Sequence, residues 1–464
     1  MEPGEQTAAA GPPRRADWSW WFVGLAALPL IVWWASWYPG FLSVDSLRFF
    51  AEADSGEFTN ETPALYAILI WLVTRVWDSP AAVSLVQVVA LVALLAAYQR
   101  RVRRLGVPGW LAASAVVMFT WLPAVAATSI AVEVQVALAL VGVWLLVELL
   151  GLAADPAEYL ADPWSATRLG VALGGAWVFH RGGFLVVLVT VAALGLGLRR
   201  RLDLLAVPVG GAVALFLLVQ GPLYAAFGVD RSVPPVGEAY APEIAAVLRH
   251  DPEWFDEADL DLLGAVADLE VWDEAYRCGD GAALVSDREF DREVIRADPG
   301  AYRGLLLRSA LSHPATTVGH RVCAAGVLFV PVQPHGERFE TYVYNVPPNT
   351  LGIVRDSLWK PGFNFTKAIL VRSDQPDQLW LWWRPALLLW PALAAVATMA
   401  VRRRHLLWPA AALVGFVALA VLTIREPSSR ETFAVYALSF LSLPLWWLAL
   451  VPGAVRPNTA RREG

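Results

Sequence analysis

The sequence has few of the residues from which metal centres and disulfide scaffolds are built. It contains two cysteines, Cys278 and Cys323, and six histidines, with no spacing between them that is typical of zinc. This argues against a zinc-binding module or a small disulfide-stabilised domain. If both cysteines lie outside the cytoplasm, one disulfide and two unpaired small side chains are equally compatible with the sequence.

Charge is also scarce. Charged residues make up 17% of the 464 residues and hydrophobic residues 57%, more apolar sequence than a soluble domain needs, so the composition predicts a polytopic helical membrane protein. Lysine occurs only at Lys360 and Lys367, which together with heavy use of arginine and alanine suggests a GC-rich bacterial genome. The formal net charge is −6, and acidic residues crowd into 229–300. That acidic segment argues against nucleic acid or an anionic lipid surface as its partner.

The chain contains many long apolar stretches. Stretches of roughly 15–22 apolar residues match the thickness of a bilayer. We expect about ten transmembrane helices, at 18–38, 80–98, 109–127, 132–151, 166–179, 184–198, 204–224, 379–400, 407–424 and 432–452. The first is too long and too rich in tryptophan for a secretory signal, so we expect it to be retained.

Arginine clusters recur on every second loop, and basic loops face the cytoplasm. This orientation makes both termini cytoplasmic and the hydrophilic segment 229–377, which we call the insert, extracytoplasmic. The protein is therefore expected to be a multi-pass protein of the bacterial plasma membrane. The clusters are Arg14–Arg15, Arg100–Arg104, Arg199–Arg201, Arg402–Arg404 and Arg456–Arg462, with Arg168 as a weaker marker.

One apolar segment, 64–76, is too short to span. As a helix it reaches only ~20 Å against a hydrocarbon core of ~30 Å, and a crossing there would invert every later loop. We expect a helix lying in or dipping into the outer interface.

The expected fold class is an all-α polytopic membrane protein with a mixed, mainly helical insert. Within the insert, the patterns around Glu243–Arg249 and Asp259–Val266 predict helices, 302–332 is apolar enough to pack on the membrane domain, and 334–378 predicts loop and short strand. The expected divisions are a cytoplasmic tail (1–17), an N-terminal membrane domain (18–228) containing the first loop (39–79), the insert (229–377), C-terminal membrane helices (378–452) and a second tail (453–464).

Charged and polar residues are expected to converge near the outer surface, where they pair or line a polar cavity because charge at membrane depth is costly. Two of these residues are acidic, and each has two possible interpretations. Asp45 is either the cap of the following helix or a general base, and Glu133 is either a snorkelling interfacial acid or part of the cavity. Arg181, followed by two glycines, either forms a simple turn or is closely approached by a ligand. Arg425 and Arg430 are either ordinary loop charges or phosphate ligands. The remaining candidates are Tyr38, Glu61 and His180.

The first loop resembles that of class C glycosyltransferases, polytopic enzymes that take sugar from a polyprenyl-phosphate donor. The resemblance rests on Tyr38-Pro39-Gly40, Ser43-Val44-Asp45-Ser46, the later Gly56-Glu57-Phe58 and the Pro63 step. The class includes protein O-mannosyltransferases and aminoarabinose transferases. Its acidic hallmark is matched by Asp45, a second acid by Glu133, an arginine-glycine step by Arg181 and a late arginine by Arg430. Glu61-Thr62 stands where a basic residue, histidine or proline usually precedes the proline.

The resemblance implies inverting transfer of a hexose or pentose to a glycan, lipid or protein of the cell envelope. It gives Asp45 the role of base and makes Glu133 a second catalytic residue with an acidic side chain. It makes Arg181, Arg430 and Arg425 ligands of the donor phosphate. His180, Glu61 and Tyr38 would contact the acceptor or form a gate. Membrane lipid would be a further partner. No cofactor or metal is demanded by the sequence, although a divalent cation on the phosphate is compatible with it.

Two other functions fit the same composition. A transporter or flippase of lipid-linked glycans would also place charges in a membrane cavity, but no repeated half with broken helices is visible. A non-catalytic envelope assembly protein would use the insert as its binding module.

Overall fold

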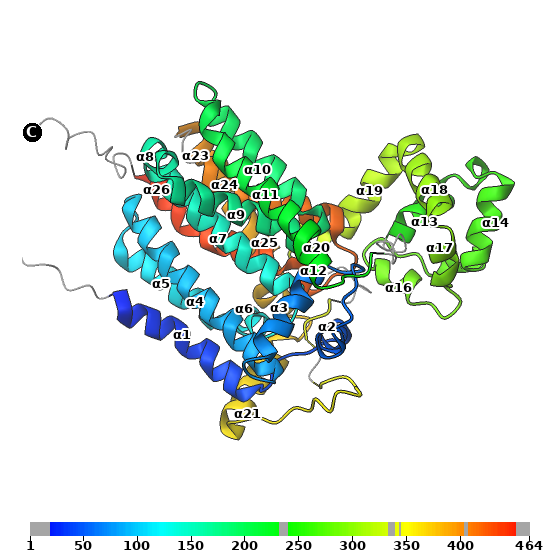
Figure 1. Ribbon diagram of the computed structural model, residues 1–464, viewed down its shortest axis with the longest axis horizontal. Helices are drawn as coiled ribbons and strands as arrows, with labels where there is room; N and C mark the ends of the chain where they lie inside the picture. The colour runs from blue at the N-terminus through cyan, green and yellow to red at the C-terminus, as the bar shows by residue number, and fades with distance from the viewer. Residues whose placement is uncertain (1–18, 232–239, 333–338, 343–344, 403–406, 452–464) are drawn as a thin grey trace, which may run out of the picture.

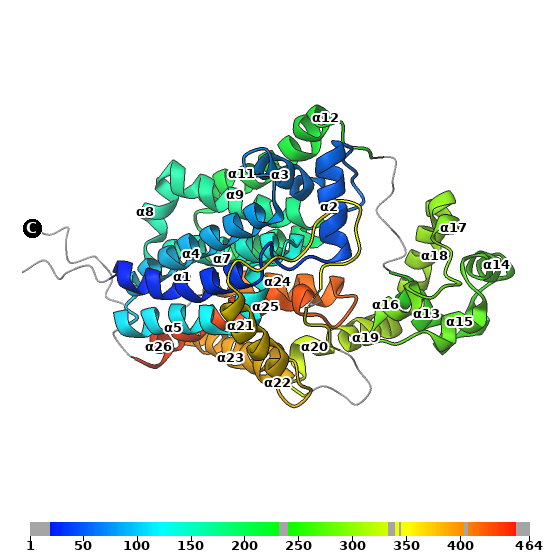
Figure 2. The same cartoon turned by 90° about the horizontal axis from the view of Figure 1, so that it is seen from below.

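The computed structural model describes residues 19–231, 240–332, 339–342, 345–402 and 407–451. These residues form an all-helical protein whose only β contacts are isolated bridges, among them Phe41 with Ala131. Figure 1 and Figure 2 show a bundle of long helices with a smaller helical group projecting from one end. Helix α1 begins and α26 ends at the opposite end of the bundle.

The N-terminal part of the bundle contains most of the long helices. They are α1 (Ser19–Ser36), α2 (Val44–Ser55), α3 (Ala64–Thr74), α4 (Pro80–Arg104), α5 (Gly109–Trp121), α6 (Pro123–Ser129), α7 (Val134–Ala154), α8 (Pro156–Ala161), α9 (Pro163–Phe179), η1 (Arg181–Gly183), α10 (Phe184–Gly197), η2 (Leu202–Leu205), α11 (Ala206–Leu218), η3 (Val219–Leu223) and α12 (Tyr224–Ala226).

The insert and the C-terminal part follow. The insert contributes α13 (Ala241–His250), η5 (Pro252–Trp254), α14 (Glu257–Val266), α15 (Leu269–Glu274), α16 (Gly281–Val285), α17 (Arg292–Ala297), α18 (Pro299–Ser312), α19 (Pro314–Ala324), α20 (Gly326–Phe329) and α21 (Lys360–Ser373). The last elements are α22 (Leu379–Trp382), α23 (Ala386–Arg402), α24 (Leu407–Thr423), α25 (Ser429–Ser442), η7 (Leu443–Leu445) and α26 (Trp446–Leu450).

Among the described residues, five helical segments are long and apolar enough to cross a membrane: Pro80–Arg104, Val134–Ala154, Leu202–Ala226, Leu379–Met399 and Ser429–Leu448. The pair α5 and α6, which is bent by 68°, passes the same test only when its two helices are taken together as one span. Pro123 causes the bend, because it has no amide hydrogen to donate and holds the preceding residue in an extended conformation. The chain is thus an integral membrane protein. The other expected spans, 18–38, 166–179, 184–198 and 407–424, fall on shorter helices and stay predictions.

Helix α7 is the centre of the bundle and is packed by α4, α9, α24 and α25. It is almost entirely apolar, as expected for a helix buried on all sides. One buried acid, Glu148, lies near its C-terminal end and accepts hydrogen bonds from Trp144, Tyr159 and Arg168. The opposite end of α7 begins at the candidate site described below.

The segment 64–76 is helical, as predicted, since α3 covers Ala64–Thr74. It packs on α2, α4 and α9 at the end of the bundle that faces the insert. Its depth in a bilayer stays a prediction.

The helices predicted at the start of the insert are confirmed as α13 and α14. Cys278 and Cys323 form a disulfide that ties the turn before α16 to α19. The predicted packing of 302–332 on the membrane domain is confirmed for α19 and α20, which contact α24 and α23, whereas α18 packs on α13 within the insert.

The prediction of loop and short strand over 334–378 is wrong for its second half, where α21 forms a helix of 14 residues. Pro361 lies in its first turn, where proline is tolerated because the amide there has no helical partner. Gly362 permits close approach to α1: a Cβ at this position would lie 2.6 Å from Ser36 Oγ. Trp37 donates a hydrogen bond from Nε1 to Thr366 Oγ1 at 2.9 Å, which fastens α21 to the end of α1. The proline and glycine therefore mark a packed helix start.

Several predictions lie outside the described residues. These are the two cytoplasmic tails, 1–17 and 453–464, and the arginine clusters at 14–15, 403–404 and 456–462. The sidedness of the membrane protein stays a prediction.

Candidate functional site

The candidate site lies where α2, α7 and α25 begin, at the end of the bundle that faces the insert. Backbone hydrogen bonds hold the first loop against the start of α7: Phe41 donates to Ile130 O at 3.4 Å, and Val132 donates to Phe41 O at 3.0 Å. This pairing brings Asp45, in the first turn of α2, close to Glu133, which immediately precedes α7. Arg430, in the first turn of α25, completes the group.

Glu133 is buried, with 4% of its surface exposed, and is therefore not a snorkelling interfacial acid. Its Oε1 accepts a hydrogen bond from Ser46 Oγ at 3.3 Å. Burial raises the pKa of Glu133 to about 7, although Arg430 and the hydroxyls of Ser43 and Ser46 act in the opposite direction. This carboxyl group can therefore gain or lose a proton near neutral pH.

Asp45 does not cap α2. The cap is Ser43, whose hydroxyl accepts from Ser46 N at 3.1 Å while Ser46 Oγ accepts from Ser43 N at 2.9 Å, a reciprocal capping box. The Asp45 side chain is 50% exposed and lies between two arginines, 3.8 Å from Arg430 and 3.6 Å from Arg48. Because the serines satisfy the helix start, the Asp45 carboxylate is available at the surface of the site.

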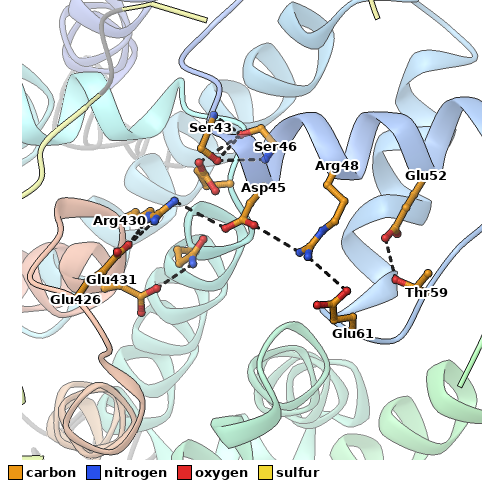
Figure 3. A network of polar contacts seen from close by, with 12 residues as sticks. Ser43, Asp45, Ser46, Arg48, Glu52, Thr59, Glu61, Glu426, Arg430 and Glu431 are labelled. Atoms are coloured by element: carbon orange, nitrogen blue, oxygen red, sulfur yellow. Dashed lines mark hydrogen bonds and ion pairs between the residues drawn. The ribbon is translucent and has the colours of Figure 1, made fainter. Parts of the chain in front are cut away.

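Arg430 connects the acids of the site (Figure 3). It pairs with Glu426 through Nη2 and with Asp45 through Nη1, and it also interacts electrostatically with Glu133. Beside it, Glu431 accepts a hydrogen bond from Gln135 Nε2 at 3.2 Å. The guanidinium of Arg430 is thus shared among several carboxylates, while Arg48 pairs with Asp45 and Arg425 interacts electrostatically with Glu431.

A cavity of about 30 Å³ opens beside Glu133 and Arg430. This is room for about one or two water molecules and too little for a sugar. Glu133 and Arg430 line it and Asp45 does not; the other lining residues are Phe41, Leu42, Ser43, Glu340, Thr341, Tyr342 and Ser428. A sugar in reach of Asp45 must therefore lie on the exposed side of the site.

The predicted residues His180 and Arg181 lie in a second group. Arg181 donates a hydrogen bond to the carbonyl of Asn60 in the first loop. His180 Nδ1 accepts from Gly182 N at 3.1 Å, which caps η1 and puts the ring proton on Nε2. Burial, with Arg425 and Arg181 nearby, lowers the pKa of His180 to about 4, so the ring is neutral at pH 7.

The glycines after Arg181 serve packing within the protein. A Cβ at Gly183 would clash with the carbonyl of Ala176 in α9, and one at Gly182 would lie 2.7 Å from Leu419 in α24. The alternative in which a ligand approaches this turn is therefore not needed to explain them.

Arg425 lies between the two groups, since it interacts electrostatically with both His180 and Glu431. Glu61 is linked to Arg48 at 3.7 Å and to Arg296 of the insert at 3.8 Å. Tyr38 is turned elsewhere: its hydroxyl contacts Ser79 Oγ at 3.2 Å, at the start of α4. Among the contacts of the described residues, none joins Tyr38 to Asp45 or Glu133.

Sequence reasoning missed Arg48, Ser43 and Tyr342. Arg48 follows Asp45 by three residues on a predicted helix, so helical spacing alone could have paired them. Ser43 competes with Asp45 as the helix cap, and Ser46 stands where the usual capping box has glutamate or glutamine, so the sequence alone does not choose between them. Tyr342 comes from the insert, and no local pattern could have brought it to the cavity wall.

The described residues contain no group of three or more histidine, cysteine, aspartate or glutamate side chains arranged to hold a metal ion. That no cofactor or metal is required, with a divalent cation on the phosphate still compatible, stays a prediction.

No protein-family model matches the chain, and no curated protein matches it significantly. Two solved structures are similar to it. One is the archaeal oligosaccharyltransferase AglB from Archaeoglobus fulgidus in complex with an inhibitory peptide and a dolichol-phosphate, at 13% identity and a TM-score of 0.42. The match covers 92% of this chain and 50% of AglB, so the chain spans half the length of that protein.

The other similar structure is ArnT from Cupriavidus metallidurans bound to undecaprenyl phosphate. It is 14% identical, has a TM-score of 0.35, and the match covers 92% of this chain and 78% of ArnT. Both are class C glycosyltransferases, the class that the first loop resembles. At these identities and TM-scores, neither similarity assigns a residue role or a substrate to this chain.

Proposed function

We propose that this protein is an inverting glycosyltransferase of the bacterial plasma membrane. It transfers a hexose or pentose from a polyprenyl-phosphate donor to a cell-envelope acceptor on the outer face. The observation that supports this most directly is the grouping of Asp45, Glu133 and Arg430, in which an exposed and a buried carboxylate share one arginine.

In the proposed reaction, Asp45 takes the proton from the acceptor hydroxyl as its oxygen attacks the anomeric carbon. The bond from that carbon to the phosphate oxygen breaks with inversion, and polyprenyl phosphate leaves as a stable anion without needing a general acid. The half-exposed position of Asp45 supports this role, because a base must reach an incoming acceptor.

Arg430 stabilises the negative charge that develops on the leaving phosphate, and the helix starts around it favour an anion in the same place. Arg425 and Arg181 approach from the neighbouring group and contribute the same sign of charge. Glu133 holds Ser46 through a hydrogen bond and, when protonated, does not repel the phosphate. Glu133 is therefore proposed to tune the charge of the site with pH.

The insert is proposed to select the acceptor, whether glycan, lipid or protein. Its Arg296 lies 3.8 Å from Glu61, which in turn lies 3.7 Å from Arg48, the neighbour of Asp45. This row of charges (Figure 3 shows the part within the first loop) supports a path by which an acceptor on the insert reaches the base. His180 and Glu61 border that path, and α3 is proposed as the gate for the lipid.

The test is release of polyprenyl phosphate by membranes containing wild type, Asp45→Asn or Asp54→Asn, given a panel of polyprenyl-phosphate sugars and an envelope extract as acceptor source. Asp54 is an exposed aspartate of the same helix and is the matched control. We expect release by wild type and Asp54→Asn, and at least a hundredfold less by Asp45→Asn.

Equal release by wild type and Asp45→Asn would remove Asp45 from the mechanism. Absence of release from every donor by the wild type, with acceptor present, would contradict a glycosyltransferase and favour a lipid flippase, which a lipid-flipping assay detects.

A further inference from the structure

Arg355 lies in the part of the insert that precedes α21, and its backbone is fixed. Asp356 N donates to Tyr38 O at 3.2 Å and Leu358 N donates to Ala35 O at 3.1 Å, so the segment runs along the end of α1. Asn349 closes the preceding turn through hydrogen bonds to Ile353 in both directions. The position of Arg355 therefore does not depend on its own side chain.

The guanidinium of Arg355 is stacked on aromatic rings. Its central carbon lies 4.7 Å from the ring centre of Trp37 and 5.3 Å from that of Phe41. Its Nε, Nη1 and Nη2 are all buried, and within the described part of the chain none has a hydrogen-bond partner. The guanidinium of Arg430, by contrast, pairs with Glu426 and Asp45.

An unpaired buried guanidinium is costly, because its five N–H donors lose their water and gain no acceptor. Burial lowers the pKa of Arg355 to about 10, which still leaves the side chain charged at neutral pH. Stacking uses only the faces of the guanidinium. The N–H groups point outward in its plane, where they suit the oxygens of a phosphate.

The ring of Phe41 lies between Arg355 and the candidate site. Phe41, on which it stacks, lines the cavity beside Glu133 and Arg430, and Tyr342 packs on Phe41 with ring centres 4.9 Å apart. The backbone of Phe41 forms the hydrogen bonds that hold the first loop to the start of α7. A ligand that reaches both arginines would thus lie along the first loop.

We propose that Arg355 is a further ligand of the donor phosphate, whose oxygens accept hydrogen bonds from the in-plane N–H groups of Arg355 while Arg430 approaches from the cavity. This inference rests on the proposed function and adds a residue from outside the membrane helices to its phosphate site. The competing explanation is a structural clamp that joins the segment before α21 to α1.

The two explanations predict opposite effects on the ligand-free protein. Removal of a structural clamp destabilises the ligand-free protein. Removal of an unpartnered buried cation leaves the stability of the ligand-free protein unchanged or raises it. Only a phosphate ligand makes the stabilisation by added phosphate depend on Arg355.

The experiment measures the unfolding temperature of the full chain in nanodiscs, alone and with undecaprenyl phosphate, undecaprenol or inorganic phosphate. The variants are Arg355→Gln, Arg355→Lys, which keeps the charge without the planar fork, and Arg75→Gln. Arg75 is the matched control, because its guanidinium also stacks on a tryptophan, 5.0 Å from the ring centre of Trp71, but is exposed. Release of polyprenyl phosphate by the same samples is measured alongside.

We expect undecaprenyl phosphate, and not undecaprenol or inorganic phosphate, to stabilise the wild type and Arg75→Gln. Arg355→Gln should unfold at the same or a higher temperature without ligand and bind undecaprenyl phosphate about tenfold more weakly, with Arg355→Lys between them.

A lower ligand-free unfolding temperature in Arg355→Gln, with unchanged lipid affinity, would establish the clamp and overturn the inference. An equal, Arg355-dependent shift with inorganic phosphate would overturn the assignment to the lipid. If the wild type releases polyprenyl phosphate and Arg355→Gln keeps full affinity for undecaprenyl phosphate, only this inference fails. If the wild type neither releases polyprenyl phosphate nor binds undecaprenyl phosphate, the proposed function fails as well.

Discussion

The hydroxyl of Ser46 donates a hydrogen bond to the buried carboxylate of Glu133 at 3.3 Å, across 87 positions of the sequence. The same hydroxyl accepts from Ser43 N and so belongs to the cap of α2. A single small side chain therefore connects the helix that carries Asp45 to the helix at the centre of the bundle, and the geometry of the site depends on it.

Ser46→Ala should affect both the cap of α2 and the carboxyl group of Glu133. Loss of the reciprocal cap and of the hydrogen bond is expected to destabilise the protein by roughly 1–2 kcal/mol. Because the hydroxyl favours the ionised form of Glu133, its loss should also move the titration of that carboxyl to higher pH. Thermal unfolding at several pH values measures both effects. Ser55→Ala, at the far end of the same helix, is the control and should leave the titration in place.

Glu133 should make stability depend on pH. Its pKa rises from 4.5 to about 7 on folding, so the folded state binds the proton more tightly than the unfolded state. The stability from this group is complete below about pH 4.5 and is lost as the pH rises through 7. We expect Glu133→Gln to flatten the decline in unfolding temperature over this range. An identical decline in the wild type and the variant would contradict the buried, protonatable Glu133.

Glu148 should matter for stability and not for the proposed chemistry. It is buried near the opposite end of α7, where it accepts from Tyr159 at 2.5 Å and from Arg168 at 3.1 Å. Glu148→Ala removes the shared acceptor and is expected to cost roughly 3 kcal/mol. Asp45→Asn, at the exposed site, should change the unfolding temperature little. Unfolding measurements on both variants, beside donor release per folded molecule, separate the two roles.

The disulfide should stabilise the insert locally. Cys278 and Cys323 are 45 residues apart, and the bond between them restricts the unfolded segment that they enclose. Replacement of both by serine is expected to cost about 2–4 kcal/mol in the insert. Limited proteolysis should then cleave within the enclosed segment before it cleaves the bundle. Equal resistance with and without the disulfide would show that packing on α24 is sufficient.

Much of the fold could be predicted from local patterns. Apolar runs of membrane length predicted α4, α7 and the span ending at Ala226, because burial in a bilayer leaves a continuous hydrophobic signal. The helices α13 and α14 followed from the patterns of apolar and polar residues around Glu243–Arg249 and Asp259–Val266. The helix α21 was missed because its first turn contains Pro361 and Gly362, which resemble loop residues until α1 packs against them.

The site was predicted in part. Asp45 and Glu133 stood out because carboxylates beside apolar segments are costly, but the choice of Ser43 as the helix cap could not be made, since serine and aspartate cap equally well. His180 and Arg181 were predicted to join the acids, and the structure places them in a neighbouring group that contacts the first loop at Asn60. Arg355 carried no signal at all in the sequence.

The sequence by itself determined that this is a helical membrane protein and which acids near its apolar segments were worth attention, because both follow from the cost of burying polar groups in lipid. Only the tertiary structure decided which charges meet. The first loop pairs with the start of α7, α25 brings Arg430 to the same place, and the segment before α21 stacks Arg355 on Phe41. Those contacts join parts of the chain that are far apart in sequence, and packing between helices, which no local pattern encodes, sets their geometry.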